Sequence, residues 1–248
     1  MDATILTIAI GAMVAGFVQG LSGFAFGMVA MSFWAWHIDP VVAAVLVVFG
    51  AWLGQIVAAL TVRRRANRRQ LLPFIIGGLA GIPLGVLVLP MLDANLFKLG
   101  LGLLLAIWCP VMLMMNRLPQ LRIGGAALDG VIGAVGGFMG GIGGFSGVIP
   151  TLWCNLRGFE KDQQRAIIQN FNLAMQTVTL LIYLSSGLIT RAILPLMAIV
   201  APAILIPTLL GTRLYLGISE LAFRRLVLSF LTLSGIALLS ASLPKLLT

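Results

Sequence analysis

Charge is what this chain has least of. Only 9% of its 248 residues are Asp, Glu, Lys or Arg, whereas 60% are hydrophobic. A water-soluble domain needs roughly a quarter of charged residues to cover its surface. The deficit excludes an ordinary soluble protein and predicts that a lipid bilayer surrounds most of the chain.

Side chains that bind metals or act as nucleophiles are also scarce. The chain has one histidine, His37, and two isolated cysteines, Cys109 and Cys154. No HExxH motif, Cys/His cluster or pair of carboxylates lies in an apolar segment, so neither a metal site nor a cofactor is predicted. Both cysteines are interpreted as small core hydrophobes.

An intramembrane serine protease is one alternative, because Gly20–Gly23 and Gly144–Gly147 both match the pattern GxSG. A serine nucleophile needs a neighbouring general base. His37 is predicted at the outer surface and precedes Ser146 by more than a hundred residues. The sequence therefore predicts that the protein is not an enzyme.

The formal net charge of +9 is concentrated in short runs, above all Arg63–Arg69. A basic run between two apolar segments is typical of a cytoplasmic loop beside anionic lipid. Aromatic residues do not alternate with these basic residues as they do in a groove for single strands. We expect the bilayer, and no nucleic acid, as a partner.

Six apolar segments approach the ~20 residues that cross a ~30 Å hydrocarbon core as a helix. They are residues 41–62, 71–91 and 96–115, and about 166–184, 192–210 and 221–243. A glycine-rich stretch precedes each triplet, at Ala3–Trp36 and Gly124–Trp153. Each of these two stretches supplies roughly 50 Å of helix, which is too little for two crossings of the bilayer. We predict hairpins of short or broken helices that meet at glycine-rich tips.

The two halves of the chain are similar. Gly16–Phe24 aligns with Gly137–Phe145 at five of nine positions, and Gln55 falls on Gln176 at the same offset. The sequence therefore predicts two repeats, residues 1–117 and 122–248, within a single integral membrane domain.

Charge indicates how the repeats are oriented, because basic loops stay cytoplasmic. Arg63–Arg69 and Asn116–Arg122 are predicted inside, whereas in the second half the basic loops follow the hairpin and the second helix after it. The second repeat is thus inverted, and both termini are predicted outside. The predicted fold is an all-α polytopic membrane protein of two inverted repeats, each a broken-helix hairpin followed by three transmembrane helices.

The glycine-rich tips are the candidate substrate site. Broken helices bring backbone N–H groups and positive helix ends to the middle of the membrane, where they bind anions without a formal charge. The alternative is that the glycines only allow close helix packing. The predicted binding residues at the tips are Gln19, Gly20, Ser22, Gly23, Phe24, Gly140, Gly143, Gly144, Phe145 and Ser146.

Amide side chains in apolar segments complete the predicted site. Asn172 and Gln176 lie on one helical face, and Gln55 has the aligned place in the first half. Buried amides need partners, so this face must point inward, either lining a pathway or bonding neighbouring helices. Asp129 has two interpretations, a helix-start residue at the interface or a proton carrier.

The run from Gly136 to Leu152, with its six glycines up to Gly144 and with Gly147 and Pro150, resembles the sulfite exporter TauE/SafE family of membrane transporters. The resemblance covers essentially the whole chain. It departs at Met31–Trp34, where no proline follows the first tip, and at Ile167–Asn170, where Ser or Thr is common. If those positions contact ligand, the substrate differs from sulfite.

The resemblance implies transport, in the export direction, of a small sulfur-containing or organic anion. Inverted repeats with interrupted helices are typical of alternating access around a central site. The expected location is the bacterial inner membrane. An anion channel and a non-transporting structural subunit stand as alternatives, and the sequence is compatible with a homo-oligomer.

Overall fold

The computed structural model describes residues 3–61, 66–115, 120–121, 123–214 and 220–247. Arg63–Arg65, the repeat boundary at residues 116–119, and Arg122 lie outside the described residues. Within them the chain is all helical. The first half comprises α1 (Ala3–Ser22), α2 (Phe26–Trp34), α3 (Pro40–Thr61), α4 (Arg68–Val88), the 3-10 turn η1 (Leu89–Met91) and α5 (Ala94–Leu113). The second half comprises α6 (Ala126–Gly143), α7 (Val148–Leu156), α8 (Lys161–Ser185), α9 (Leu194–Leu214) and α10 (Glu220–Leu247).

Eight of these helices are long and apolar enough to cross a bilayer. The predicted hairpins form, but their arms are unequal. α1 and α6 have 20 and 18 residues, close to the length of a full crossing, whereas α2 and α7 have nine residues each. The fold is therefore the predicted all-α polytopic membrane architecture, with a full-length first arm that the sequence did not predict.

Polar residues fix where several helices begin. Asp93 Oδ1 accepts hydrogen bonds from the N–H groups of Asn95 and Leu96, both at 2.8 Å, and so caps α5. Asn67 caps α4 by accepting from the Arg69 N–H at 3.0 Å. These side chains satisfy amides that have no partner within the helix.

Each half contributes its first helix to a contact between long helices. α6 packs along α4, and α1 packs along α9. Small residues make both contacts: a side chain on Gly81 would collide with the Ala134 carbonyl oxygen, and one on Gly211 with the Phe17 carbonyl oxygen. Close backbone approach of this kind is how helices associate in membranes. Further contacts between long helices join α5 with α10, α3 with α9, α4 with α8 and α3 with α8.

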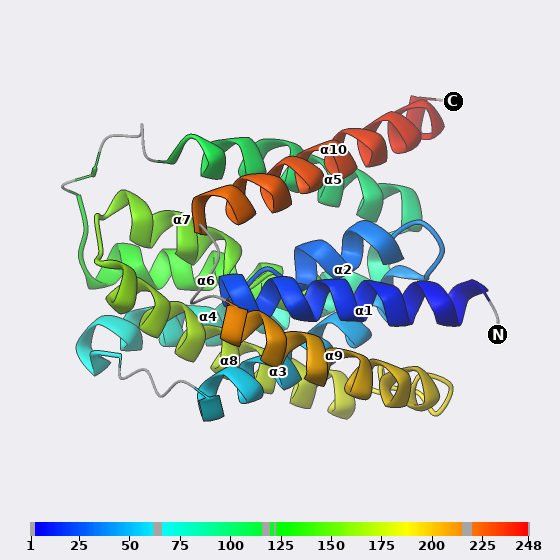
Figure 1. Cartoon of the computed structure of the whole chain (residues 1–248), viewed down its shortest axis with the longest axis horizontal. Helices are drawn as coiled ribbons and strands as arrows, with labels where there is room; N and C mark the ends of the chain where they lie inside the picture. Colours follow the sequence, from blue (N-terminus) through cyan, green and yellow to red (C-terminus); the bar gives the residue numbers. More distant parts are fainter. Residues whose placement is uncertain (1–2, 62–65, 116–119, 122, 215–219, 248) are drawn as a thin grey trace.

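The helices run along the long axis of the molecule (Figure 1). α1 and α3 run from the right of Figure 1 to the left, and α6 and α8 run the opposite way. The first turns of α4 and α6 and the connection 156–161 lie at the left end, and the connections 34–40, 88–94 and 185–194 lie at the right.

The core lies where α2, α3 and α8 meet. Trp34, Leu46 and Phe171 are among its fully buried side chains. Cys109 and Cys154 are free and buried, as predicted.

Candidate functional site

Both glycine-rich tips are breaks between helices. α1 ends at Ser22 and α2 begins at Phe26, while α6 ends at Gly143 and α7 begins at Val148. Gly23 has φ +85° and Gly144 has φ +74°. This left-handed conformation costs a residue with a Cβ roughly 1–2 kcal/mol. Glycine at these two positions therefore allows the chain to turn back.

The two breaks lie against each other inside the protein. A Cβ atom on Gly27 would lie 3.1 Å from the Gly144 carbonyl oxygen. Trp108 of α5 contacts both breaks: its ring meets Phe24 edge-on at a centroid distance of 5.8 Å, and its indole N–H donates to the Val148 carbonyl oxygen at 3.1 Å. Irregular backbone at membrane depth is thus surrounded by protein, as the bilayer requires.

The second break presents free backbone donors. The N–H groups of Gly144 and Val148 are bonded to preceding carbonyl groups. Those of Ser146, Gly147 and Ile149 make no hydrogen bond to the described residues. They lie at the N-terminus of α7, where the helix dipole is positive. This arrangement favours an acceptor with negative charge.

Asn172 adds a side-chain donor to these amides. The Ser146 hydroxyl donates to Asn172 Oδ1 at 3.0 Å, which leaves Nδ2 as the free end of the amide. Nδ2 lies so close to Gly147 that a Cβ there would be 2.7 Å away. Asn172 is only 1% exposed, and its Nδ2 has no acceptor. A buried unpaired donor costs about 1–3 kcal/mol, so the arrangement indicates an acceptor from outside the protein.

The polar face of α8 points inward. Gln176 and Thr179 follow Asn172 at helical spacing and are 3% and 1% exposed. Gln176 Oε1 and Thr179 Oγ1 have no hydrogen-bond partner. Thr177, on an adjacent stripe, accepts a hydrogen bond from the Trp52 indole of α3 at 3.0 Å, as expected for the interhelical bonding alternative. The helix thus contains both bonded and unbonded polar groups.

The first break has different chemistry. Ser22, one of the predicted binding residues, accepts hydrogen bonds through its Oγ from the N–H groups of Phe24 and Ala25 at 3.4 and 3.3 Å. Gln55 Nε2 donates to the Gly23 carbonyl oxygen at 2.6 Å, and Gln19 Nε2 donates to that of Ala51 at 2.9 Å. The N–H groups of Gly23, Phe24 and Ala25 are therefore bonded within the protein.

Comparison with known proteins identifies the chain. The sequence model of the family described as Sulfite exporter TauE/SafE matches residues 8–238, a span that contains both breaks and every polar residue described above. The chain belongs to the sulfite exporter TauE/SafE family. It is accordingly a multi-pass membrane protein of a family of anion transporters, not of enzymes. No curated protein and no solved structure matches it.

Three predicted glycines of this TauE/SafE transporter lie in tight packing contacts. A Cβ on Gly20 would collide with the Thr208 carbonyl oxygen of α9. One on Gly140 would lie 3.0 Å from Ser146 Cβ, and one on Gly143 would lie 2.7 Å from the Phe145 ring. These three positions therefore agree with the alternative interpretation, in which the glycines allow close packing. They shape the walls of the breaks.

An apolar cavity of about 740 Å³, open on one side, lies between α5 and the pair α6 and α7. Phe145 of the second break and Trp108 line it, together with aliphatic side chains such as Leu104 and Ile149. None of the predicted polar residues lines this cavity. In this structure the polar groups at the breaks are therefore closed off from it.

Three residues near the breaks were not predicted. Thr179 continues the spacing of Asn172 and Gln176, so its sequence position could have indicated it. Thr151 of α7 is 3% exposed and its Oγ1 has no partner. Trp108 joins the two breaks only through tertiary packing, and nothing in the surrounding sequence indicates this role.

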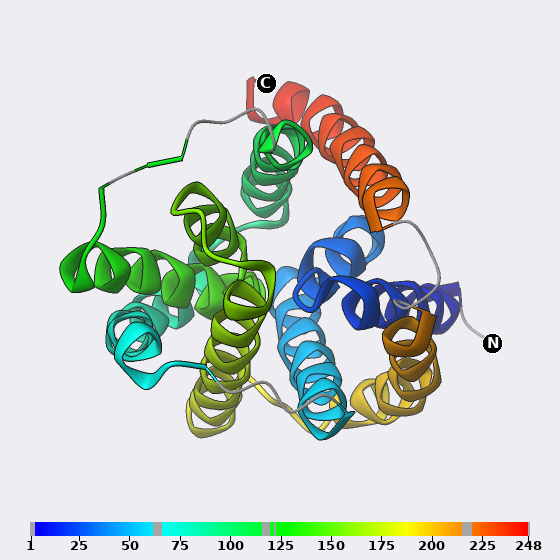
Figure 2. The ribbon, with the colours of Figure 1, turned by 60° about the vertical axis from the view of Figure 1, so that its left-hand side comes forward.

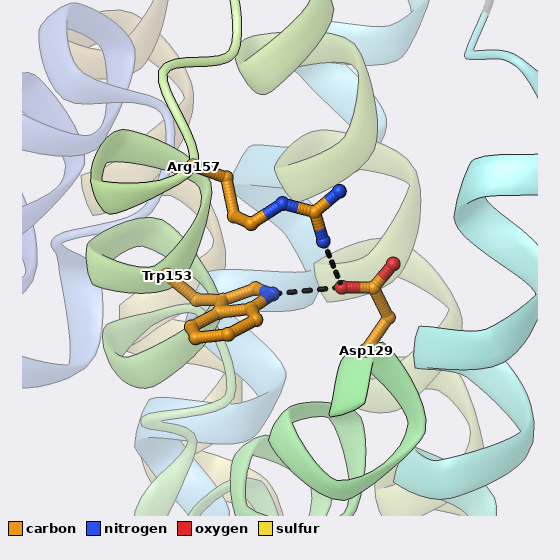
Figure 3. A network of polar contacts seen from close by, with 3 residues as sticks. All are labelled: Asp129, Trp153 and Arg157. Atoms are coloured by element: carbon orange, nitrogen blue, oxygen red, sulfur yellow. Dashed lines mark hydrogen bonds and ion pairs between the residues drawn. The ribbon is translucent and has the colours of Figure 1, made fainter. Parts of the chain in front are cut away.

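Asp129 lies at the opposite end of the second hairpin from the break (Figure 3). Its Oδ1 accepts a hydrogen bond from the Trp153 indole at 2.7 Å and forms an ion pair with Arg157 at 3.1 Å. Asp129 is in the first turn of α6, which agrees with the helix-start interpretation. The three side chains fasten the end of α7 to the start of α6. Within the described residues, no three His, Cys, Asp or Glu side chains gather as metal ligands.

Proposed function

We propose that this transporter carries a small oxyanion, sulfite or an organosulfonate, which binds at the second break. The observation that carries the proposal is the free amide nitrogen of Asn172 next to the free backbone N–H groups at the start of α7. A donor of α8 thus lies beside the start of α7. Hydrogen bonds from preorganised amides hold an oxyanion without a buried positive charge.

The depth of this site suits a transporter. Asn172 is eleven residues from the start of α8 at Lys161, or about 17 Å along the helix. This is near the middle of a ~30 Å hydrocarbon core. The substrate of a repeat-built transporter binds at that level, at the interface between the repeats. Gly144 touches α2 and α3 of the first half, so the break lies at that interface.

Two observations support alternating access between repeats 1–117 and 122–248. The first is that corresponding helices, such as α1 and α6, run in opposite directions in Figure 1. The second is an asymmetry around α5 and α10 (Figure 2). Phe230 of α10 stacks on Phe33 of α2 at a centroid distance of 5.9 Å, whereas the corresponding pair, α5 and α7, meet at the hydrogen bond from Trp108 to Val148 and leave an apolar cavity between their other side chains. If α5 packed on α7 as α10 now packs on α2, and α10 moved away from α2, the cavity would close and another would open on the opposite side of the membrane.

The charge distribution supports a bacterial inner membrane with the left end of Figure 1 in the cytoplasm. Arg68 and Arg69 begin α4, and Arg157 and Lys161 flank the connection between α7 and α8. These connections lie at that end in Figure 1. Basic residues are retained on the cytoplasmic side. Both termini would then lie outside. Efflux would carry the anion from the cytoplasmic side, where the basic residues lie, to the opposite side of the membrane.

The test is the variant Asn172→Leu, which keeps the side-chain size and removes the donor. A hydrogen bond to a charged group contributes about 1.5–3 kcal/mol, so the Kd for sulfite should rise about 10- to 150-fold. Kd is measured from the concentration dependence of the thermal unfolding of purified protein, and efflux from proteoliposomes is measured alongside. Asn155→Leu is the control, because Asn155 bonds within α7 to the Thr151 carbonyl oxygen. Unchanged sulfite affinity in the Asn172 variant would exclude this site.

A further inference from the structure

The first break also contains buried polar side chains without a partner. Its backbone amides at Phe24 and Ala25 are already bonded to Ser22 Oγ. The polar atoms there without a partner are Gln19 Oε1 and Gln55 Oε1. Gln19 is 2% exposed and Gln55 is 1% exposed. Two buried carbonyl-type oxygens thus lack a donor at the same helix break.

The orientation of both amides is fixed by the backbone. Each Nε2 donates to a carbonyl oxygen, of Ala51 for Gln19 and of Gly23 for Gln55. Rotating either amide by 180° would put two oxygens in contact, so the unpartnered atom is the oxygen in each case. An anion cannot satisfy these atoms, because oxygen acceptors repel it. They call for a hydrogen-bond donor or a cation.

The two glutamines lie in one seam between α1 and α3. Their backbone partners show this: Gln19 reaches Ala51, and Gln55 reaches Gly23, one helical turn further along both helices. Ala51 and Gln55 are therefore about 6 Å apart along the axis of α3. The Gln19 amide packs directly on Gly54, where a Cβ would collide with Oε1. Both oxygens thus lie beside the end of α1.

The backbone at this end of α1 adds negative potential. α1 ends at Ser22, and the last carbonyl groups of a helix have no donor within it and form the negative end of its dipole. Such ends, with unwound carbonyl groups, coordinate Na⁺ in transporters with discontinuous helices. All the oxygens described here are neutral. A divalent ion is normally held by carboxylates, so neutral oxygens favour a monovalent ion.

We propose that the first break binds an alkali-metal cation through Gln19 Oε1, Gln55 Oε1 and carbonyl oxygens at the end of α1. The observations that support the cation site do not depend on the anion site. Its consequence rests on the proposed function: with the two breaks in contact, a cation at the first lowers the electrostatic cost of an anion at the second. Transport of the anion would then be coupled to the cation.

The experiment measures the unfolding temperature of the purified full chain while sodium chloride replaces choline chloride at constant ionic strength. A parallel series uses potassium chloride. A ligand that binds only the folded state raises this temperature in a concentration-dependent way. We expect a saturable rise with Na⁺ or K⁺, and its loss in Gln19→Leu and in Gln55→Leu. Ser242→Ala is the control, since Ser242 is buried in α10 and bonds only within that helix.

Equal unfolding temperatures in all three salts would overturn the proposal, and so would a rise that persists in both glutamine variants. If one glutamine variant does not fold, the other carries the test. If neither folds, the comparison of the three salts in the parent protein decides. Sulfite binding is titrated separately in choline buffer and in sodium buffer. A sodium response with no sulfite binding in either buffer supports the cation site and rejects the proposed function. Sulfite binding without a sodium response rejects only the cation site.

Discussion

Gly147→Ala is the sharpest test of the second break, because the substitution changes space without changing backbone conformation. Gly147 has φ −80° and ψ −8°, in the right-handed helical region that alanine adopts freely. The obstacle is Asn172. A Cβ on Gly147 would lie 2.7 Å from Nδ2 and 2.9 Å from Oδ1, whereas non-bonded atoms prefer about 3.5–4 Å. The amide must therefore move by about 1 Å.

The movement has two consequences of different size. It strains the 3.0 Å bond between Ser146 and Asn172, which lowers stability by about 0.5–1.5 kcal/mol. It also takes Nδ2 away from the anion, a loss of about 1.5–3 kcal/mol. The Kd for sulfite should therefore rise about 10- to 150-fold, while the protein still folds and inserts.

The assay compares sulfite Kd and sulfite efflux in Gly147→Ala and Gly100→Ala. Gly100 is an exposed glycine of α5, and a Cβ added to it would have no heavy atom within 4 Å. Its replacement should increase stability by about 0.5–1 kcal/mol and leave the Kd unchanged. A Gly147 variant that binds sulfite within twofold of the parent would refute the reasoning, since the new methyl group cannot avoid the Asn172 amide.

Two further substitutions probe the supports of the breaks. Gly23→Ala should lower stability by about 1–2 kcal/mol through left-handed strain alone, because no heavy atom is within 4 Å of its Cβ position. Gly144→Ala should cost about 1–3 kcal/mol more, since its Cβ would lie 2.7 Å from Val47 Cγ1; equal losses in thermal unfolding would contradict this. Asp129→Asn should lower stability by about 1–3 kcal/mol and Trp153→Phe by about 0.5–1.5 kcal/mol, both with unchanged sulfite Kd. A large change in Kd for either would instead assign the Asp129 network to the transport site.

Much of the fold could be predicted because the bilayer constrains a chain so strongly. Long apolar segments must be helices, and glycine clusters between shorter ones mark where the helices break. The positions of Gly23 and Gly144 illustrate this, since both breaks occur where the repeat alignment put them. The full length of α1 was missed because its glycines suggested a shorter arm. In the structure, Gly11 and Gly16 lie inside a regular helix and accommodate Trp34 and Ile204.

The candidate site was predictable only as a set of residue types. Ser22 and Ser146 look equivalent in the sequence, and both were predicted to bind the ligand. The structure separates them: the first accepts from the backbone of its own break, and the second bonds the amide of Asn172. The difference arises because a hydroxyl group takes whichever partner its helix break brings near, and local sequence does not specify that partner.

The sequence by itself determined the solvent, the helical segments, the two breaks and the family, because each follows from hydrophobicity, from glycine's conformational freedom or from local motifs. Only the tertiary structure decided which polar atoms stay unpaired. Asn172 has a free donor, and Gln19 and Gln55 have free acceptors, because of carbonyl and hydroxyl groups that other helices supply. Hydrogen-bond complementarity depends on groups distant in the chain, and it is this property that distinguishes an anion site from a cation site.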